Sequence, residues 1–162
     1  MILDATAFRR EMWYDKNYSE AIYMDKRKGH FENEHYDWSI DIHPDVAAVW
    51  SHSPFKNECF DQVLFDPPHK VGNSYSVFQE LYGQLGLWTW QREIFEAVKE
   101  FHRVLKPKGM LFFKWAETSK ASERAIAIIK SAGFKPLFGS RTASGKTSAI
   151  WVVYVKEVKK ND

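Results

Sequence analysis

Five short apolar runs, spaced along the chain, constrain the fold more than any other feature of the sequence. They span residues 1–5, 21–25, 46–50, 60–66 and 110–115. Their apolar residues do not alternate strictly with polar ones, which is typical of strands buried on both faces of a parallel sheet. Three of the runs carry an aspartate at or near the carboxyl end, namely Asp4, Asp25 and Asp66. Because the carboxyl ends of neighbouring parallel strands share an edge, we expect Asp4 and Asp25 to lie at one edge of the sheet, and Asp66 to follow the carboxyl end of its own strand.

Two further segments have the three-to-four spacing of apolar residues that is typical of amphipathic helices. The first covers residues 89–105 and is followed by Lys106-Pro107-Lys108-Gly109, a sequence that stops helices. The second covers residues 119–132 and ends before Gly133, which suits a helix C-cap. The sequence predicts that residues 26–45 are mainly loop, with a short strand at 38–42.

The sequence pattern of residues 137–155 predicts an antiparallel hairpin. Apolar strands at 137–138 and 150–155 flank a polar segment, 139–148, that is expected to form the connecting loop. Together, these elements predict an α/β fold with three layers, in which the sheet is mostly parallel and closes with this C-terminal hairpin.

Length and composition limit the class of protein. A chain of 162 residues is expected to form one domain, here residues 1–158, with residues 159–162 as a frayed tail. Cys59 is the single cysteine, so no intrachain disulfide can form. No apolar run approaches the roughly 20 residues of a membrane span, and no basic segment precedes an apolar core, so we expect a cytoplasmic protein with no membrane partner. The histidines lie in polar sequence without ligand spacing, and we predict no metal site.

The charge is distributed unevenly along the chain. Residues 1–81 carry 8 Lys or Arg and 14 Asp or Glu, a net charge of −6. Residues 82–162 carry 15 and 7, a net charge of +8. This asymmetry favours a polyanionic partner for the C-terminal half, and Arg141 and Lys146 in the expected hairpin are candidates for phosphate contacts. The alternative is an ordinary solvated surface, because no dense cluster of basic residues is present.

The sequence Asp66-Pro67-Pro68-His69 follows directly after residues 60–65 of the fourth apolar run. Two prolines end a strand, stiffen the loop and remove two N–H donors, so the local backbone is rich in acceptors. Such a loop suits a substrate that donates hydrogen bonds, for example an amino group, with the planar ring of His69 beside it. The alternative is a plain turn at the end of a strand.

The spacing of two other acids is also informative. Asp25 follows Asp4 by 21 residues, close to the separation at which a Rossmann-like site places its ribose-binding acid. The alternative for Asp25 is a solvated acid beside Lys26 and Arg27.

Asp66-Pro67-Pro68-His69 resembles the [Asp/Asn/Ser]-Pro-Pro-aromatic motif of amino-methyltransferases of class I, which use S-adenosylmethionine to methylate exocyclic amino groups of nucleic-acid bases. Residues 2–7 resemble the first motif of this family, and Met24-Asp25 resembles the second. Residues 53–55 with 59–61, and residues 101–109, resemble the stretches before its fourth and fifth strands. The resemblance covers roughly residues 1–156 and is to small phage-type or bacterial members with a Rossmann-like fold.

The resemblance implies S-adenosylmethionine as cofactor and a nucleic acid, DNA or RNA, as partner, with adenine as the favoured acceptor base. Because the chain leaves no room for a separate sequence-reading domain, a DNA substrate would require a homodimer, a partner subunit or loose specificity, whereas an RNA could be read by its shape through phosphate contacts. The implied catalytic residues are Asp66, Pro67, Pro68 and His69. The implied cofactor-binding residues are Asp4, Ala5, Thr6, Ala7, Met24, Asp25, Ser51 and Asp66. The implied substrate-binding residues are His69, Tyr75, Trp88, Arg141 and Lys146.

The sequence departs from the family pattern at three places. Residues 4–10 contain no glycine, residues 50–52 contain no acid, and His69 stands where Tyr, Phe or Trp is commoner. Two alternatives therefore stay open. The first is a small-molecule N-methyltransferase in which residues 70–88 close over the substrate, although residues 76–82 could instead be a helix packed on the core. The second is a degenerate, non-catalytic binding subunit.

Overall fold

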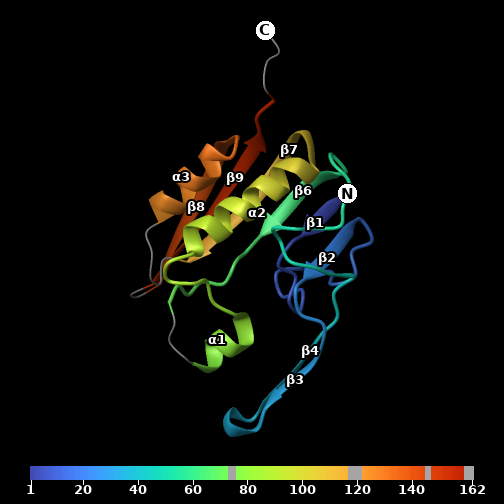
Figure 1. The fold of residues 1–162 in the computed structure, drawn as a ribbon, viewed down its shortest axis with the longest axis vertical. Coiled ribbons are helices and arrows are strands. Elements are labelled where there is room, and N and C mark those ends of the chain that lie inside the picture. The colour runs from blue at the N-terminus through green and yellow to red at the C-terminus, as the bar shows by residue number, and fades with distance from the viewer. Residues whose placement is uncertain (73–75, 117–121, 145–146, 159–162) are drawn as a thin grey trace.

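The computed structural model describes residues 1–72, 76–116, 122–144 and 147–158, and a central sheet dominates the part of the chain that it describes (Figure 1). Seven strands form this sheet in the order β5-β2-β1-β6-β7-β9-β8. The strands β1, β2, β5, β6 and β7 are parallel, whereas β9 runs antiparallel to both β7 and β8. Their bounds are β1 Ile2–Asp4, β2 Ala21–Asp25, β5 Val46–Ala47, β6 Phe60–Phe65, β7 Leu105–Ala116, β8 Phe134–Ser144 and β9 Thr147–Lys156. The predicted α/β fold with a C-terminal antiparallel hairpin is confirmed.

The two predicted amphipathic helices form, and both lie on one face of the sheet. They are α2, Trp90–Val104, and α3, Ser122–Ser131. The apolar stripe of α2 includes Ile94, Val98 and Phe101, all fully buried, and the Phe101 ring lies 4.9 Å from the ring of Phe65 on β6. Burying side chains of this size contributes about 1.5–3 kcal/mol each. Gly133 ends α3 with a φ of 92°, the left-handed conformation that its predicted C-cap role requires.

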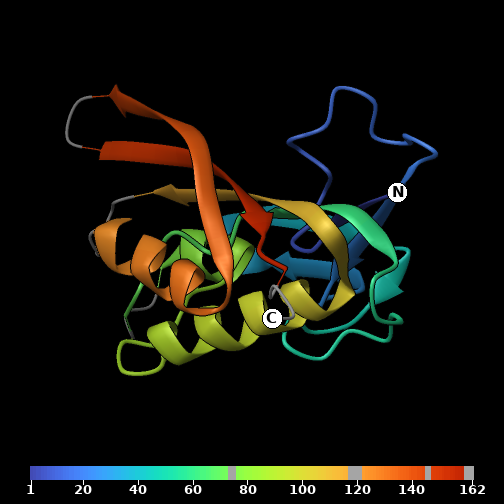
Figure 2. The same ribbon diagram turned by 90° about the horizontal axis from the view of Figure 1, so that it is seen from above.

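The opposite face of the sheet is covered over β1 and β2 by the segment that connects these strands, residues 5–20. Figure 2 shows this segment on the side of the sheet away from α2 and α3. Its Trp13 packs edge-on against Tyr23, with ring centroids 5.2 Å apart, beside the buried Ala7 and Ala21. The third layer of the fold is therefore this irregular segment.

The prediction that residues 29–33 form loop is wrong. They form β3, Gly29–Asn33, which pairs antiparallel with β4, Trp38–Ile42, and a short 3-10 helix, Glu34–Tyr36, joins the two strands. This two-stranded arm projects from the end of the molecule that also carries α1 (Figure 1). Because β3 alternates between exposed and half-buried residues and belongs to no core cluster, its sequence contains no apolar run that could reveal it.

The prediction that residues 139–148 form a loop is also wrong. The strand β8 continues to Ser144, and β9 begins at Thr147. Residues 135–143 of this edge strand are exposed, so polar side chains are tolerated along a regular strand.

The strand expected at 46–50 is confined to Val46–Ala47. Within the 70–88 segment a helix does form, α1, Val77–Tyr82. The tail expected at 159–162 lies outside the described residues.

Candidate functional site

A cavity of about 610 Å³ lies at the carboxyl ends of β1, β2 and β6. The strand β1 lies between β2 on one side and β6 on the other. The order of the strands reverses between β1 and β6, and such a topological switch point is where open α/β sheets bind ligands. Its volume is within the range of about 300–1,000 Å³ that is usual for small-molecule sites. The aspartates that end these strands all line it, and its walls include Asp4, Ala5, Thr6, Ala7, Phe8, Asp25, Trp50, Asp66, Pro67, Pro68, His69, Tyr82 and Lys114.

The carboxyl group of Asp4 organises the first loop of the cavity. The side chain is 1% exposed, and it accepts hydrogen bonds from the backbone N–H of Thr6 at 3.1 Å and from the indole Nε1 of Trp13 at 2.7 Å. Burial, together with the nearby Asp66 and Asp25 carboxylates, raises the pKa of Asp4 to about 6, although both hydrogen bonds oppose the rise. Through Thr6 and Trp13, Asp4 therefore anchors the segment 5–20 to the end of β1.

Asp25 holds the same loop from the end of β2. Its Oδ2 accepts a hydrogen bond from the backbone N–H of Phe8 at 3.0 Å, and its Oδ1 accepts one from the backbone N–H of Arg27 at 2.8 Å. Phe8 adopts a left-handed φ of 46°, which is uncommon for a residue with a side chain. A carboxylate offers about four lone-pair sites, so Asp25 keeps acceptor capacity for hydroxyl groups of a ligand.

The Asp66-Pro67-Pro68-His69 motif is tied to the first loop and to β7. The backbone N–H of Asp66 donates to Thr6 Oγ1 at 2.9 Å, and the ammonium group of Lys114 donates to Asp66 Oδ2 at 2.8 Å. Asp66 Oδ1 lies 3.7 Å from His69 Nδ1 and accepts no hydrogen bond from any described residue. Burial lowers the pKa of His69, and the Lys114 ammonium lowers it further against the opposing effect of Asp66, so the imidazole is neutral at pH 7.

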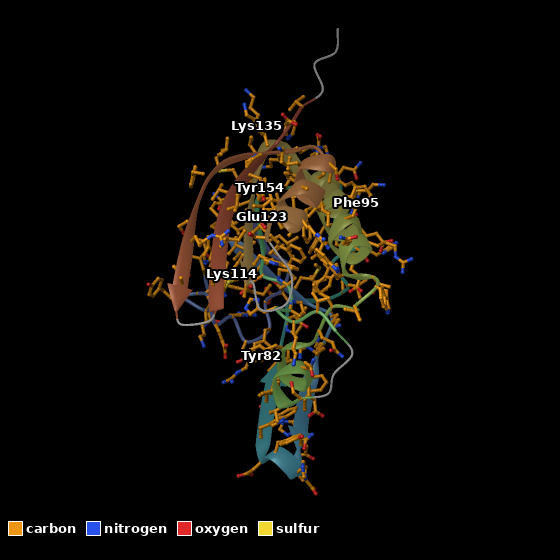
Figure 3. All side chains as sticks on the ribbon, turned by 90° about the vertical axis from the view of Figure 1, so that its left-hand side faces the viewer. Tyr82, Phe95, Lys114, Glu123, Lys135 and Tyr154 are labelled. Atoms are coloured by element: carbon orange, nitrogen blue, oxygen red, sulfur yellow. The ribbon has the colours of Figure 1, made fainter. Side chains whose placement is uncertain are left out.

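Lys114 is a site residue that the sequence analysis did not identify. It is the single charged residue in the run 110–115, and Figure 3 shows it on β7. Burying a lone lysine within an apolar strand costs free energy unless the ammonium group has a partner. The position of Lys114 in this run therefore indicates that an acidic partner lies nearby. Its partner, Asp66, lies 48 residues earlier, and the parallel pairing of β6 with β7 brings the two together.

The helix α1 closes one side of the cavity. The ring of Tyr82 lies 5.2 Å from the ring of Phe8, and the Arg27 guanidinium lies 5.1 Å from the same Phe8 ring. Arg27 also donates a hydrogen bond to the backbone carbonyl of Leu81. These contacts link the ends of β1 and β2 to α1.

The cavity does not include every residue that the sequence assigned to the site. The Met24 side chain is fully buried in the core, and Ser51 is absent from the cavity walls. Trp88 is 88% exposed on the segment before α2, also away from these walls. Arg141 points to the helix side of β8, where it donates a hydrogen bond to Ser122 Oγ at 3.1 Å. Tyr75 and Lys146 lie outside the described residues.

The residues that the structure describes were also searched for metal sites and for membrane-spanning helices. Within them, no three His, Cys, Asp or Glu side chains are grouped so that they could hold a metal ion. Nor does any of the described helices have the length and apolar character needed to span a membrane.

The fold is similar to that of solved methyltransferases. One is the 1,6-didemethyltoxoflavin-N1-methyltransferase of Burkholderia thailandensis, solved with 1,6-didemethyltoxoflavin and S-adenosylhomocysteine. It matches with a TM-score of 0.61 and 14% identity over 96% of this chain and 70% of that one. Another is a TehB-like S-adenosylmethionine-dependent methyltransferase of Corynebacterium glutamicum, with a TM-score of 0.57 and 12% identity over 96% of this chain and 79% of that one.

Other comparisons are weaker. The [4+2]-cyclase SpnF matches with a TM-score of 0.49 and 12% identity over 70% of this chain, which spans only 56% of SpnF. No protein-family model matches the sequence, and no curated protein matches it. At these identities the comparisons show the fold, which is the Rossmann-like fold of S-adenosylmethionine-dependent methyltransferases.

The cavity walls fit S-adenosylmethionine. The first loop has no glycine, but Ala5 and Ala7 line the cavity with the smallest possible side chains. Asp25 stands at the end of β2 with acceptor capacity for ribose hydroxyls, and Trp50 offers an apolar ring for the adenine part. The Asp4 carboxyl group at the end of β1 also lines the cavity, and its negative charge, when ionised, suits a cationic sulfonium group.

Proposed function

We propose that this chain is an S-adenosylmethionine-dependent methyltransferase that acts on an exocyclic amino nitrogen of a nucleic-acid base, with adenine favoured. The observation that carries this proposal is the state of Asp66. Its Oδ2 is held by Lys114 at 2.8 Å, whereas its buried Oδ1 receives no hydrogen bond from the described residues. A buried carboxylate oxygen without a donor is costly, so it calls for a donor from a ligand.

The chain's own residues act by holding and orienting the acceptor. Asp66 Oδ1 and the Pro67 carbonyl accept hydrogen bonds from the two N–H groups of the amino group, which turns the nitrogen lone pair toward the cofactor side of the cavity. As the N–CH3 bond forms and the methyl–sulfur bond breaks, one of these protons passes to Asp66 Oδ1, and S-adenosylhomocysteine is the leaving group. His69 stacks on the acceptor ring. When bound, S-adenosylmethionine supplies a methyl group that is already electrophilic. The protein therefore contributes position and electrostatics, with no covalent enzyme intermediate.

The charges around Asp66 favour a neutral, conjugated amino group over an alkylamine. An alkylamine is protonated at pH 7 and would meet the ammonium group of Lys114, 2.8 Å from Asp66. The lowered pKa of His69 also makes it a weak base for removing that proton. The amino group of a nucleobase is neutral at pH 7, because its lone pair is delocalised into the ring, so it needs no deprotonation before attack.

A small heteroaromatic substrate is the second candidate. Gln79 and Tyr82 of α1 line the same cavity as Asp66, so a small acceptor could be enclosed there. The structurally similar protein of Burkholderia thailandensis is named for N1-methylation of such a compound. The two candidates differ in the acceptor, while Asp66 has the same role in both.

The test is transfer of a labelled methyl group from S-adenosylmethionine to total RNA and total DNA, followed by digestion and nucleoside analysis. We expect label in a base methylated on its amino group, most of it in N6-methyladenine nucleoside. Label in neither nucleic acid, from a protein that binds S-adenosylhomocysteine, would contradict the nucleic-acid proposal and favour the small-molecule acceptor. Failure to bind the cofactor would contradict both and favour a non-catalytic subunit.

A further inference from the structure

The face of β7, β9 and β8 that points away from α2 and α3 carries no described helix (Figure 2). Directly paired residues of antiparallel strands share a face. Phe112 pairs with Val153, and Lys114 pairs with Trp151. Across β9, Phe138 pairs with the same Val153, and Ser140 pairs with Trp151. These side chains belong to one continuous surface, which we call the open face.

The opposite side of the same strands is the helix-covered core. Leu111, Phe113 and Trp115 alternate with the open-face residues along β7 and are buried. Arg141 follows Ser140 on β8, and it bonds to Ser122 of α3. The assignment of the two faces therefore follows from both register and contacts.

The open face has a composition unlike the rest of the chain. It contains no Asp or Glu at any described position of these three strands, although the chain has 21 such residues. Phe138 is 65% exposed and Met110 is 37% exposed, so apolar groups face solvent. The face consists of Met110, Phe112, Lys114 and Ala116 on β7, Ala149, Trp151, Val153 and Val155 on β9, and Lys135, Phe138, Ser140 and Thr142 on β8.

This surface is continuous with the candidate active site. The Lys114 ammonium lies 5.8 Å from the ring of Trp151 and also donates to Asp66 Oδ2 at 2.8 Å. Figure 3 shows Lys135 far from Lys114, toward the opposite end of the strands. Along β7 the face extends over about 20 Å from Met110 to Ala116, at about 3.3 Å per residue. A small molecule bound at Asp66 would leave most of this length empty.

We propose that the open face binds single-stranded nucleic acid and leads the acceptor base to Asp66; this inference rests on the proposed function and names the form of its substrate. Unpaired bases stack on aromatic rings, for which the exposed Phe138 and the partly exposed Trp151 are placed. The Lys135 ammonium group and the Ser140 and Thr142 hydroxyls suit the phosphates and sugars. The absence of acidic side chains along the described strands removes the repulsion that a polyanion would meet.

The test measures binding of a fluorescently labelled, mixed-sequence oligonucleotide of about 12 nucleotides by anisotropy, without methyl donor. Single-stranded RNA, single-stranded DNA and the corresponding duplex are compared. Phe138→Ala removes an exposed ring and should weaken single-strand binding about tenfold. Phe95→Ala is the matched control, because Phe95 is 37% exposed on α2, on the helix-covered side (Figure 3), and should leave binding unchanged.

A second variant tests the electrostatic part. Lys135→Gln should reduce the salt dependence of binding by about one released counterion while it weakens binding to all sequences alike. Sedimentation of each variant shows whether the open face instead mediates self-association.

The inference is overturned if Phe138→Ala and Phe95→Ala bind equally well, if duplex binds as tightly as single strand, or if Phe138→Ala dissociates a dimer without changing oligonucleotide affinity. These outcomes are distinct from failure of the proposed function. Binding at the open face without methyl transfer would contradict the proposed function and support the nucleic-acid site on the open face. Methylation of nucleic acid with unchanged binding by Phe138→Ala would support the proposed function and contradict the site on the open face.

Discussion

The ion pair between Lys114 and Asp66 sets the chemistry of the site at the scale of single residues. Both side chains are partly buried, and their 2.8 Å contact orients one carboxylate oxygen and leaves the other for a ligand. Removing one partner of such a pair leaves the other charge without compensation.

We predict that Lys114→Met lowers the rate of methyl transfer by about tenfold to a hundredfold, with a smaller effect on cofactor affinity, since Asp66 then loses its fixed orientation. Lys114→Arg should recover part of the rate. The same Lys114→Met change should raise the pKa of His69, because it removes the repulsion of a neighbouring cation. An NMR titration of the imidazole measures this directly. An unchanged His69 titration would show that Lys114 does not face the motif.

Asp25 carries the second residue-level prediction. Hydrogen bonds to a charged acceptor are worth about 1.5–3 kcal/mol, so Asp25→Ala should weaken binding of S-adenosylhomocysteine by roughly tenfold to a hundredfold. Calorimetry measures the affinity, and Asp25→Asn, which keeps one carbonyl oxygen for Phe8 or Arg27, serves as the conservative comparison. Wild-type affinity in a folded Asp25→Ala protein would remove Asp25 from the cofactor site.

The sequence reveals some of these residues and hides others for a physical reason. Asp25 and Asp66 end apolar runs, so their place at the sheet edge follows from local pattern alone. Lys114 acts through Asp66, 48 residues away, which strand pairing brings next to it. Trp13 acts through Asp4 across an irregular segment whose packing no local pattern reveals. The assignments of Met24 and Ser51 came from the resemblance, which does not specify which way a side chain points.

At the scale of elements, the segment 5–20 is held to the sheet by Asp4. Burial raises the pKa of Asp4 from its ordinary value of 3.8 to about 6. Between these values the folded protein binds a proton that the unfolded chain has lost, so the contribution of this group to stability falls as the pH rises through that window.

This linkage predicts a difference between wild type and Asp4→Asn, whose side chain does not titrate. From about pH 4 to about pH 7 the wild type should lose about 2 kcal/mol of unfolding free energy relative to the variant. Urea denaturation at both pH values measures the change, and comparing the two proteins cancels effects of other groups. Parallel pH profiles would contradict the buried, protonated state of Asp4.

The accuracy of the predicted elements depends on burial. β2, α2 and α3 carry continuous or periodic apolar residues against the core, and the sequence predicts them within a few residues of their observed ends. The arm of β3 and β4 and the outer half of the β8–β9 hairpin are half-exposed ribbons, in which cross-strand hydrogen bonds replace apolar burial. Their polar sequences are indistinguishable from loop without knowledge of the pairing.

At the scale of the whole molecule, the sheet is asymmetric. The helices α2 and α3 lie on one face, whereas the other face is covered over β1 and β2 by residues 5–20 and carries no described helix over β7, β9 and β8 (Figure 2). The half of the chain with the net charge of +8 contains β7, β9 and β8, and also the helices α2 and α3 on the covered face. We relate this asymmetry to the acceptor, which would approach from the open side.

Cofactor binding should stabilise the whole molecule. A ligand present at a hundredfold excess over its Kd adds about 2.7 kcal/mol, which raises the Tm of a chain of this length by about 5–10 °C. Thermal denaturation with S-adenosylhomocysteine measures this shift, with adenosine as the control ligand. An identical Tm with and without S-adenosylhomocysteine would support the non-catalytic alternative.

The role of Asp66 is the central claim, and single-turnover methyl transfer by Asp66→Ala tests it most directly. The reaction uses the acceptor that the labelling experiment identifies, at saturating S-adenosylmethionine. We predict that the rate of transfer falls at least a hundredfold while the affinity for S-adenosylhomocysteine stays within about twofold of wild type, because Asp66 acts on the amino group of the acceptor. A folded Asp66→Ala protein that transfers methyl groups at close to the wild-type rate would contradict the account.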